Sequence, residues 1–189
     1  MEKLSSLRPV FVKPNGTVTA GNASPITDGA SACLLMNVEE AKKQGYKPEV
    51  VIKGYTYSAH NPDGELLLGP AFTIPKLMNE AGLKVEDVDV WEIHEAFAGQ
   101  VLANLNALKD KDFCKEFLEL DDAFGDIPME KINTEGGSLS LGHPFGATGG
   151  RLLISASRRL KASKGKYAVI AACAAGGQGS SILLEKITK

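Results

Sequence analysis

YAVIAACAAGGQGSSILLEK, residues 167–186, contains two apolar runs separated by a glycine-rich turn. The runs 167–173 and 180–186 are rich in small, branched and aromatic residues, so each predicts a strand. Upstream, residues 145–160 have apolar residues at helical spacing after a start rich in Gly, Ala and Ser. The chain is therefore predicted to end with a long helix and two strands.

The same alternation extends through the rest of the chain. Further strands are predicted at 29–36, 50–57 and 88–93, and further helices at 38–44, 73–81 and 94–108. Gly45 and Gly82 follow two of these helices as C-terminal stops, and Pro75 falls in a predicted first turn. Strands that alternate with helices predict an α/β layered fold.

Three segments have no helix or strand pattern. Residues 8–24 hold several Pro, Gly and Asn residues and are predicted to be an extended, turn-rich lead-in, and residues 61–64 are predicted to be a turn. The acidic stretch 109–131 lacks apolar periodicity, so we expect it to be an exposed excursion. All 189 residues are otherwise expected to form one domain with a substantial core.

The composition excludes several classes of function. A formal net charge of −2 and scattered basic residues give no basis for nucleic-acid binding. Cys33, Cys114 and Cys173 form no CxxC or Cys–His grouping, which favours a reducing compartment and predicts neither a disulfide framework nor a metal site. No apolar run approaches the length of a membrane span, and the N-terminal residues resemble neither a signal peptide nor a presequence.

His143 stands in GHPFGATG, at a Gly-Pro bend before the predicted helix 145–160. A helix N-terminus lowers the pKa of a nearby imidazole, and a neutral ring can take a proton from a thiol or donate a hydrogen bond to a carbonyl. The alternative is a surface histidine in a turn. The stretch 136–149 lacks both GxGxxG spacing and a P-loop ending, so a nucleotide site is rejected.

Cys173 ends a predicted strand and enters AAGGQG, where successive backbone N–H groups can point at one place. Such donors and a nearby imidazole would lower the thiol pKa from about 8.5. A buried, inert cysteine is the competing interpretation. A metal trio of His94, His143 and Cys173 has no supporting ligand spacing.

His94-Glu95-Ala96-Phe97 follows the predicted strand 88–93. His94 is interpreted either as a functional imidazole or as a helix cap. Glu95 can orient His143 or a neighbour, or serve as an ordinary carboxylate in a first helical turn. On the residues alone, Phe97 belongs to a core.

Five segments taken together resemble the C-terminal half of the thiolase family. In chain order they are GTVTAGNAS (16–24) with DGA (28–30), LGP (68–70), HEAF (94–97), GGSLSLGHP (136–144) and CAAGGQG (173–179). The resemblance covers nearly the whole chain. It implies one half of the duplicated thiolase fold, a mixed β-sheet covered by helices, with residues 1–189 as a C-terminal domain and the N-terminal half absent.

The resemblance also implies roles for single residues. His143 would activate a nucleophilic cysteine, Cys173 would move the α-proton of the acetyl unit, and His94 would hold a water at an enolate oxygen. Many thiolases have asparagine in place of His94, whereas the trifunctional-enzyme β branch has histidine. Ser24, Phe97, Ala175 and Gly176 would bind the coenzyme A substrate. The family commonly has glycine in place of Ala175, which puts the turn conformation in question.

The family's acylated cysteine lies in its N-terminal half, and none of the three cysteines here has a matching context. The resemblance thus implies a 3-ketoacyl-CoA thiolase half, an acyltransferase of mitochondrial β-oxidation that uses coenzyme A and acyl-CoA as substrates without a bound cofactor. Its expected partners are an N-terminal thiolase half, further copies in a homo-oligomer, and a trifunctional-type α subunit. The alternative is a non-catalytic module that binds acyl-CoA or a partner protein.

Overall fold

A four-stranded sheet forms the centre of the computed structural model, which describes residues 2–187. Its strands are β1 (Val50–Ala59), β2 (Val88–Ile93), β3 (Tyr167–Ala174) and β4 (Gln178–Lys186). They lie side by side in the order β1-β4-β3-β2. β4 pairs antiparallel with both β1 and β3, and β2 pairs parallel with β3. The prediction of an α/β fold is confirmed, and the sheet is mixed.

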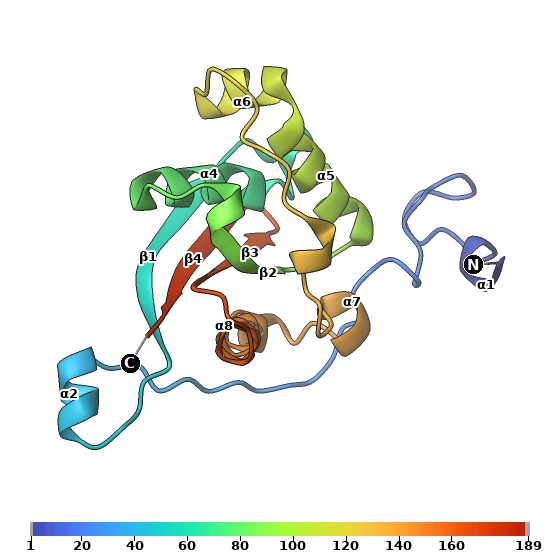
Figure 1. Ribbon diagram of the computed structural model, residues 1–189. Helices are drawn as coiled ribbons and strands as arrows, with labels where there is room; N and C mark the ends of the chain where they lie inside the picture. The colour runs from blue at the N-terminus through green and yellow to red at the C-terminus, as the bar shows by residue number, and fades with distance from the viewer. Residues whose placement is uncertain (1, 188–189) are drawn as a thin grey trace.

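Helices cover both faces of this sheet (Figure 1). α4 (Gly69–Ala81) and α5 (Ala98–Lys109) lie over one face with α6 (Lys111–Leu118) beyond them, and α8 (Phe145–Ala162) lies under the other. The short helices are α1 (Glu2–Ser5), α2 (Val38–Lys43), α3 (Pro62–Glu65) and α7 (Ser138–Leu141), with 3₁₀ turns η1 (Val85–Asp87) and η2 (Met129–Lys131). Within residues 2–187, none of the helices is long and apolar enough to cross a membrane.

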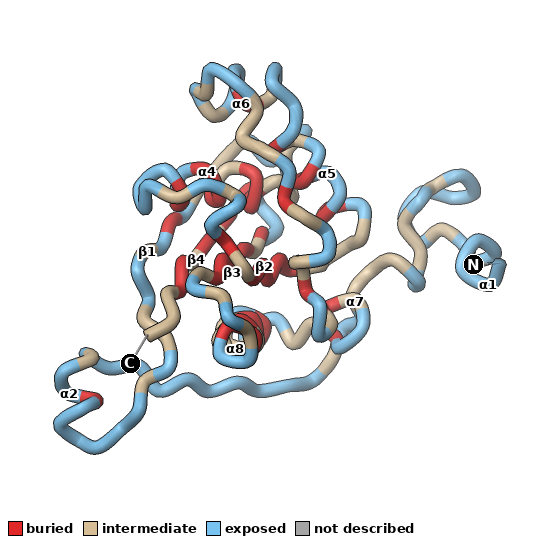
Figure 2. Tube along the Cα trace, in the orientation of Figure 1, coloured by how far each residue is buried: buried red, intermediate tan, exposed pale blue. Residues whose placement is uncertain are grey.

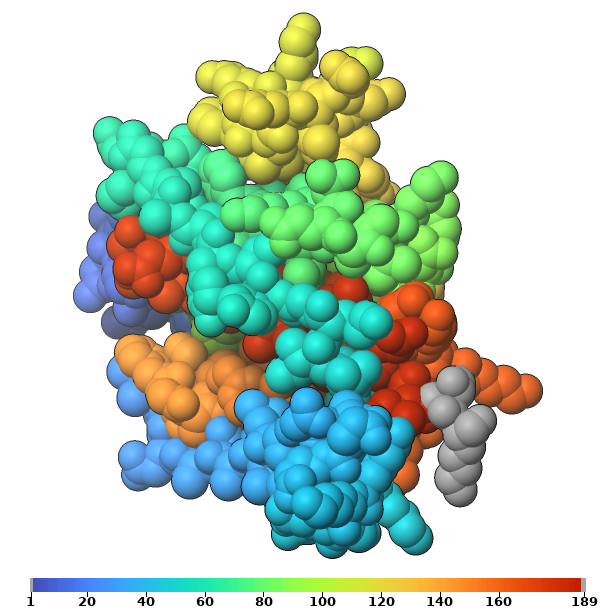
Figure 3. Space-filling view, turned by 90° about the vertical axis from the view of Figure 1, so that its left-hand side faces the viewer, coloured from blue at the N-terminus to red at the C-terminus, as the bar shows by residue number. Residues whose placement is uncertain are grey.

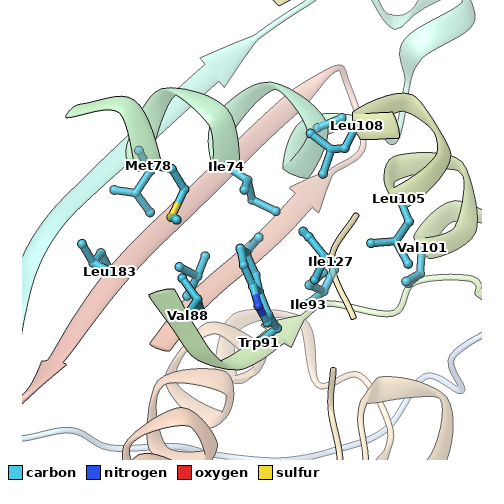
Figure 4. Packing of buried hydrophobic residues seen from close by; sticks show 14 residues of the cluster. Ile74, Met78, Val88, Trp91, Ile93, Val101, Leu105, Leu108, Ile127 and Leu183 are labelled. Atoms are coloured by element: carbon cyan, nitrogen blue, oxygen red, sulfur yellow. The ribbon is translucent and has the colours of Figure 1, made fainter. Parts of the chain in front are cut away.

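Side chains of the strands alternate between two cores. Trp91 and Ile93 of β2 pack with Ile74 and Leu105 under α4 and α5 (Figure 4). Val90 points the other way and packs with Leu152 of α8. This two-residue period is the one expected of a strand buried on both faces.

Most predicted elements are present, with shifted ends. The helix predicted at 94–108 begins only at Ala98, because the backbone N–H of His94 still donates to the carbonyl of Ala171 and thus extends the sheet. The helix predicted at 73–81 begins at Gly69, so Pro75 lies inside the helix rather than in its first turn.

The strand predicted at 29–36 is wrong. These residues run extended and exposed along the outside of the molecule (Figure 2). Their contacts are with α8, where the Ser31 hydroxyl donates to the Ala147 carbonyl at 2.8 Å. Figure 3 shows this blue segment beside the orange residues of α8. An apolar run becomes a strand only where another strand takes its backbone hydrogen bonds, and among the described residues none does so here.

The acidic stretch 109–131 is largely exposed but contains structure that the sequence pattern did not predict. Asp110 caps α6 by accepting hydrogen bonds from the backbone N–H groups of Asp112 and Phe113. Cys114 and Ile127 are buried within the stretch. Phe113, Cys114, Phe117 and Leu118 recur at helical spacing within α6, so the expectation that this stretch lacks apolar periodicity is wrong.

Candidate functional site

His94 lies at the C-terminal end of β2, where that strand runs parallel to β3. Its side chain is 3% exposed. The imidazole Nδ1 lies 2.9 Å from the Ser138 Oγ, which also accepts a hydrogen bond from Arg151 Nη2 at 2.8 Å. Burial, followed by the nearby His143 and Arg151, lowers the pKa of His94 from 6.5 to about 4. His94 is therefore neutral at physiological pH.

His143 is placed by the bend that precedes α8. Gly142 has a φ of 104°, a conformation that L side chains rarely adopt, and turns the chain out of α7. The His143 backbone N–H then donates to the Pro25 carbonyl at 3.1 Å. Its Nδ1 lies 2.8 Å from the Thr148 Oγ1 in the first turns of α8. The pKa of His143 is lowered, as the sequence predicted, but burial is the largest cause, followed by Arg151.

The two imidazoles meet although they come from segments about fifty residues apart in the chain. The ring centroids of His94 and His143 are 4.1 Å apart with an interplanar angle of 42°. Phe145 also stacks on His143, with ring centroids 4.4 Å apart. His94 and His143 are thus two neutral rings in contact. The Nδ1 atom of each ring is hydrogen-bonded to a hydroxyl group, so both Nε2 atoms remain for a substrate.

Cys173 lies near the C-terminal end of β3, the strand beside β2. His94 follows the C-terminal end of β2, so both residues are at the same end of the sheet. Cys173 is two residues past Ala171, the residue that accepts from the His94 backbone. Burial raises the pKa of its thiol from 9.0 to about 11, so the expected lowering of that pKa is wrong. Among residues 2–187, no hydrogen bond joins this thiol to an imidazole, and the opposing effect of a backbone hydrogen bond at Cys173 is smaller than that of burial.

The turn after Cys173 accommodates Ala175 without strain. The positive φ angles fall on Gly176 (104°) and Gly177 (73°), and Ala175 does not need one. Gly177 also accepts a hydrogen bond from the His60 backbone at 2.8 Å, which fixes the turn to the loop after β1. Alanine at 175 is therefore compatible with the turn that the resemblance implied.

Ser24 and Phe97, both predicted to bind substrate, lie on segments that pair with each other. The Ser24 backbone N–H donates to the Ala96 carbonyl at 2.9 Å, and Ala23 forms a bridge with Phe97. Phe97 is half-buried and has Phe11 against its ring rather than a core. The structure brings these residues to the segment that carries His94, and their role toward a ligand stays a prediction.

Glu95 does not orient His143. Its carboxylate accepts from the Asn133 side chain at 2.6 Å and from the Leu139 backbone N–H at 3.0 Å. Asn133, at a φ of 45°, also exchanges hydrogen bonds with both backbone groups of Ile93. Glu95 and Asn133 thus hold α7 against the end of β2.

Sequence reasoning missed the polar residues that support the imidazoles. Ser138 was visible only as one letter of the GGSLSLGHP motif, and Thr148 and Arg151 only as polar residues in a helix. A separate hollow between α2, β1 and α8 is lined by Leu34, Ala41 and other apolar residues, and no histidine lines it.

Comparison with known proteins gives the family. The family model described as thiolase, C-terminal domain, matches residues 46–186. The chain belongs to the thiolase family. The model of the thiolase N-terminal domain matches residues 1–39, so the two matches divide between residues 39 and 46. The assignment of residues 1–189 to a single C-terminal domain stays a prediction.

Individual thiolases are similar over the whole chain. A probable 3-ketoacyl-CoA thiolase of Caenorhabditis elegans is 60% identical over 189 residues, which are 100% of this chain and 42% of that protein. The mitochondrial trifunctional enzyme subunit beta of Mus musculus is 48% identical, with 100% of this chain and 40% of that protein covered. The chain thus spans about two fifths of the length of these relatives.

Solved thiolase structures share the fold. An acetyl-CoA acetyltransferase of Bacillus anthracis superposes with a TM-score of 0.82 at 35% identity, over 98% of this chain and 42% of that one. Human mitochondrial 3-ketoacyl-CoA thiolase in complex with CoA gives a TM-score of 0.78 at 36% identity, over 99% and 43%. The thiolase fold predicted from the motifs is confirmed.

Proposed function

We propose that this chain is the catalytic C-terminal half of a 3-ketoacyl-CoA thiolase, which transfers an acyl group between an enzyme cysteine and coenzyme A or acetyl-CoA. The observation that carries the proposal is the pair of neutral imidazoles, His94 and His143, at the end of the sheet where Cys173 is the last residue but one of β3. The similarity to 3-ketoacyl-CoA thiolases supports the substrate class. The nucleophilic cysteine would come from a thiolase N-terminal half.

Each side chain has a role that suits its surroundings. A neutral His143 takes the proton of the attacking thiol, whether from the nucleophilic cysteine or from coenzyme A. The thiolate attacks the keto carbon, the bond between the two carbonyl-bearing units breaks, and its electron pair becomes the enolate of acetyl-CoA. His94 places a hydrogen-bond donor or a bound water at the oxygen that gains charge.

Cys173 then gives its proton to the enolate carbon and becomes a thiolate. A thiol whose pKa is raised to about 11 is fully protonated at neutral pH, so it is ready to act as this acid. In the synthetic direction the thiolate would remove the same proton from acetyl-CoA. The raised pKa makes that thiolate a stronger base than an ordinary cysteine.

Coenzyme A would be held between the paired segments 23–24 and 96–97 and the glycine turn after Cys173. We assign substrate contacts to Ser24, Phe97, Ala175 and Gly176. Ala175 and Gly176 are exposed in the turn and can offer backbone groups to a ligand. No bound cofactor enters the scheme, since coenzyme A is itself a substrate.

The similarity to mitochondrial trifunctional enzyme subunit beta and to human mitochondrial thiolase supports a place in mitochondrial β-oxidation. We extend the proposal to a homo-oligomer and to a trifunctional-type α subunit as a partner. Subunit beta of that enzyme, by its name, is one part of a larger assembly.

One observation favours a second candidate, a module that binds acyl-CoA without catalysis. Of the three cysteines, Cys33 is exposed on the extended stretch 29–36 and Cys114 is buried in α6, so only Cys173 lies on the strand beside the one that His94 follows. A chain that never meets a second thiol could bind an acyl-CoA but could not form an acyl-enzyme.

A reconstitution experiment distinguishes the catalytic half from the binding module. The chain is expressed with a separate thiolase N-terminal half, and thiolysis of acetoacetyl-CoA is followed. We expect turnover that His143→Ala abolishes and that Ser140→Ala, an exposed change on α7, leaves intact. Coenzyme A binding by calorimetry without any turnover would favour the binding module instead.

A further inference from the structure

The Ser138 hydroxyl is a buried junction between a cation and an imidazole. Ser138 is the first residue of α7 and is fully buried. Its Oγ lies 2.8 Å from Arg151 Nη2 and 2.9 Å from His94 Nδ1. Three side chains from three separate elements therefore meet at one oxygen atom.

Counting donors and acceptors assigns the proton at this junction. A guanidinium only donates, so the Ser138 oxygen accepts from Arg151, and the serine has a single O–H hydrogen left to donate. Within residues 2–187, the remaining hydrogen-bond partner of Oγ is His94 Nδ1. If Nδ1 carried a hydrogen, two donors would point at the serine and its own buried O–H would have no acceptor. The arrangement that satisfies every group has the serine donating to an unprotonated Nδ1.

We propose that Ser138 and Arg151 are positioning residues that hold His94 as the Nε2–H tautomer, so that this ring always presents a hydrogen-bond donor to the charged oxygen of the thioester intermediate. The inference rests on the proposed function and adds to it how His94 is oriented. A freely exchanging imidazole would spend part of its time as the other tautomer, with an acceptor lone pair facing an oxygen that also accepts.

Arg151 contributes a second effect through its charge. Among residues 2–187, the Nε and Nη1 atoms of Arg151 are buried without a hydrogen-bond partner, and its charge also acts on the buried carboxyl of Glu92, whose pKa it lowers. That charge lowers the pKa of both His94 and His143, in each case after the larger effect of burial. A protonated His94 would carry a hydrogen on Nδ1 and lose the bond from Ser138. The cation therefore favours the same neutral ring that the hydroxyl orients.

The ring proton can be observed directly. The chain has three histidines, His60, His94 and His143, so a histidine-labelled sample gives a nitrogen–carbon correlation spectrum simple enough to assign by substitution. At pH 7.5 we expect His94 Nδ1 to be unprotonated and hydrogen-bonded, and Nε2 to be protonated. In Ser138→Ala the two tautomers should mix, whereas in Ser140→Ala the spectrum should be unchanged. A protonated Nδ1 in the unsubstituted chain, or an unchanged tautomer in Ser138→Ala, overturns the proposal.

Activity supplies a second readout in the complex with an N-terminal half. Ser138→Ala should lower kcat about tenfold with KM nearly unchanged, because the lost orientation matters most where charge develops. Ser138→Thr, which keeps the hydroxyl, should restore both the tautomer and most of kcat. A Ser138→Ala variant with full kcat, or a loss confined to KM, would contradict the proposal.

The proposed function and the positioning proposal are contradicted by different results. If the unsubstituted complex has no thiolase activity but its His94 is the Nε2–H tautomer, the proposed function is wrong and the assignment of the positioning residues stands. Should Ser138→Ala not fold, as judged by circular dichroism, the tautomer of the unsubstituted chain alone decides.

Discussion

The Glu95 carboxylate accepts a hydrogen bond from the backbone N–H of Leu139, 3.0 Å away and 44 residues later in the chain. Leu139 is in the first turn of α7, where backbone N–H groups lack partners within the helix. The carboxylate therefore caps α7 and fixes it to the loop that follows β2. This contact places Ser138 against His94, so the geometry of the imidazole depends on the carboxylate of the next residue in the chain.

Substituting Gly137 should disturb this contact. A Cβ at position 137 would overlap the Glu95 carboxylate, which cannot move without losing its bonds to Asn133 and Leu139. Gly137→Ala should lower the free energy of unfolding by about 2 kcal/mol. Gly99→Ala, at an exposed position of α5 where a Cβ meets nothing, is the control and should be neutral or slightly stabilising. Urea unfolding of both measures the difference, and equal stabilities would contradict the role of Glu95.

Removing one partner of the buried ion pair between Glu92 and Arg159 should destabilise the fold. Arg159 Nη1 lies 2.5 Å from Glu92 Oε1, and both side chains are nearly inaccessible. Burial already raises the pKa of Glu92, and Arg159 opposes that rise. Arg159→Met should therefore destabilise the fold by about 3 to 5 kcal/mol.

The double variant Glu92→Leu/Arg159→Met tests the cause. This double variant removes the uncompensated carboxylate. It should recover at least half of the lost free energy of unfolding, as measured by thermal and urea unfolding. A double variant as unstable as Arg159→Met would show that the Arg159 bonds to the Trp91 and Lys131 carbonyls, rather than the charge, carry the effect.

Stability should fall in mildly acidic solution because of His94. The pKa of His94 is about 4 in the folded chain and 6.5 ordinarily, so between these two pH values the unfolded chain binds a proton at His94 and the folded chain does not. The contribution is fully present above pH 6.5 and is lost as the pH falls through the window from 6.5 to about 4. Its size is about 3 kcal/mol.

The matched variant for this titration is His94→Asn, which cannot take up the proton. Thermal unfolding of both forms from pH 7.5 to 4 should show a steeper loss for the unsubstituted chain. Parallel curves would mean that His94 titrates normally in the fold. His143, whose pKa is also lowered, adds a change of the same sign to both forms.

The three thiols should differ in reactivity. Cys33 is exposed, whereas Cys173 is buried and its pKa is raised to about 11. Iodoacetamide at pH 7.5 should therefore alkylate Cys33 first and Cys173 at least about tenfold more slowly, since only the thiolate reacts. In a Cys33→Ser variant, followed by peptide mass spectrometry, the rate at Cys173 should keep rising beyond pH 10. A rate that levels off by about pH 10 would show an ordinary thiol, because a thiol with a pKa of about 8.5 is almost fully ionised there.

The isolated chain should self-associate. The apolar side of α8 is not what drives this association, since its Leu152 is fully buried against the sheet. The structure instead exposes apolar side chains along the extended segment, with Ile26 at 87% and Leu34 at 70%. Such a patch favours association. Light scattering should show a mass that rises with concentration, and Leu34→Lys/Leu35→Lys should reduce it. A single monomer mass at all concentrations would refute the expectation.

The sequence by itself determined the elements whose pattern is local. The run 167–173 is apolar throughout, as a strand buried on both faces requires, and the run 88–93 is apolar at four of its six positions; both are strands in the structure. The motifs around His94, His143 and Cys173 were sufficient to predict the family and the residues of the candidate site. Local composition carries this information because each motif places its residue at the end of a strand or at a bend.

The tertiary structure decided everything that depends on distant partners. The apolar run 29–36 is not a strand because no neighbouring strand pairs with it among the described residues. Likewise, the thiol at 173 has a raised pKa because of what buries it, although its turn alone suggested the opposite. The support of His94 by Ser138 and Arg151 was invisible in the sequence, since a hydroxyl and a guanidinium become a network only when folding brings them to one atom.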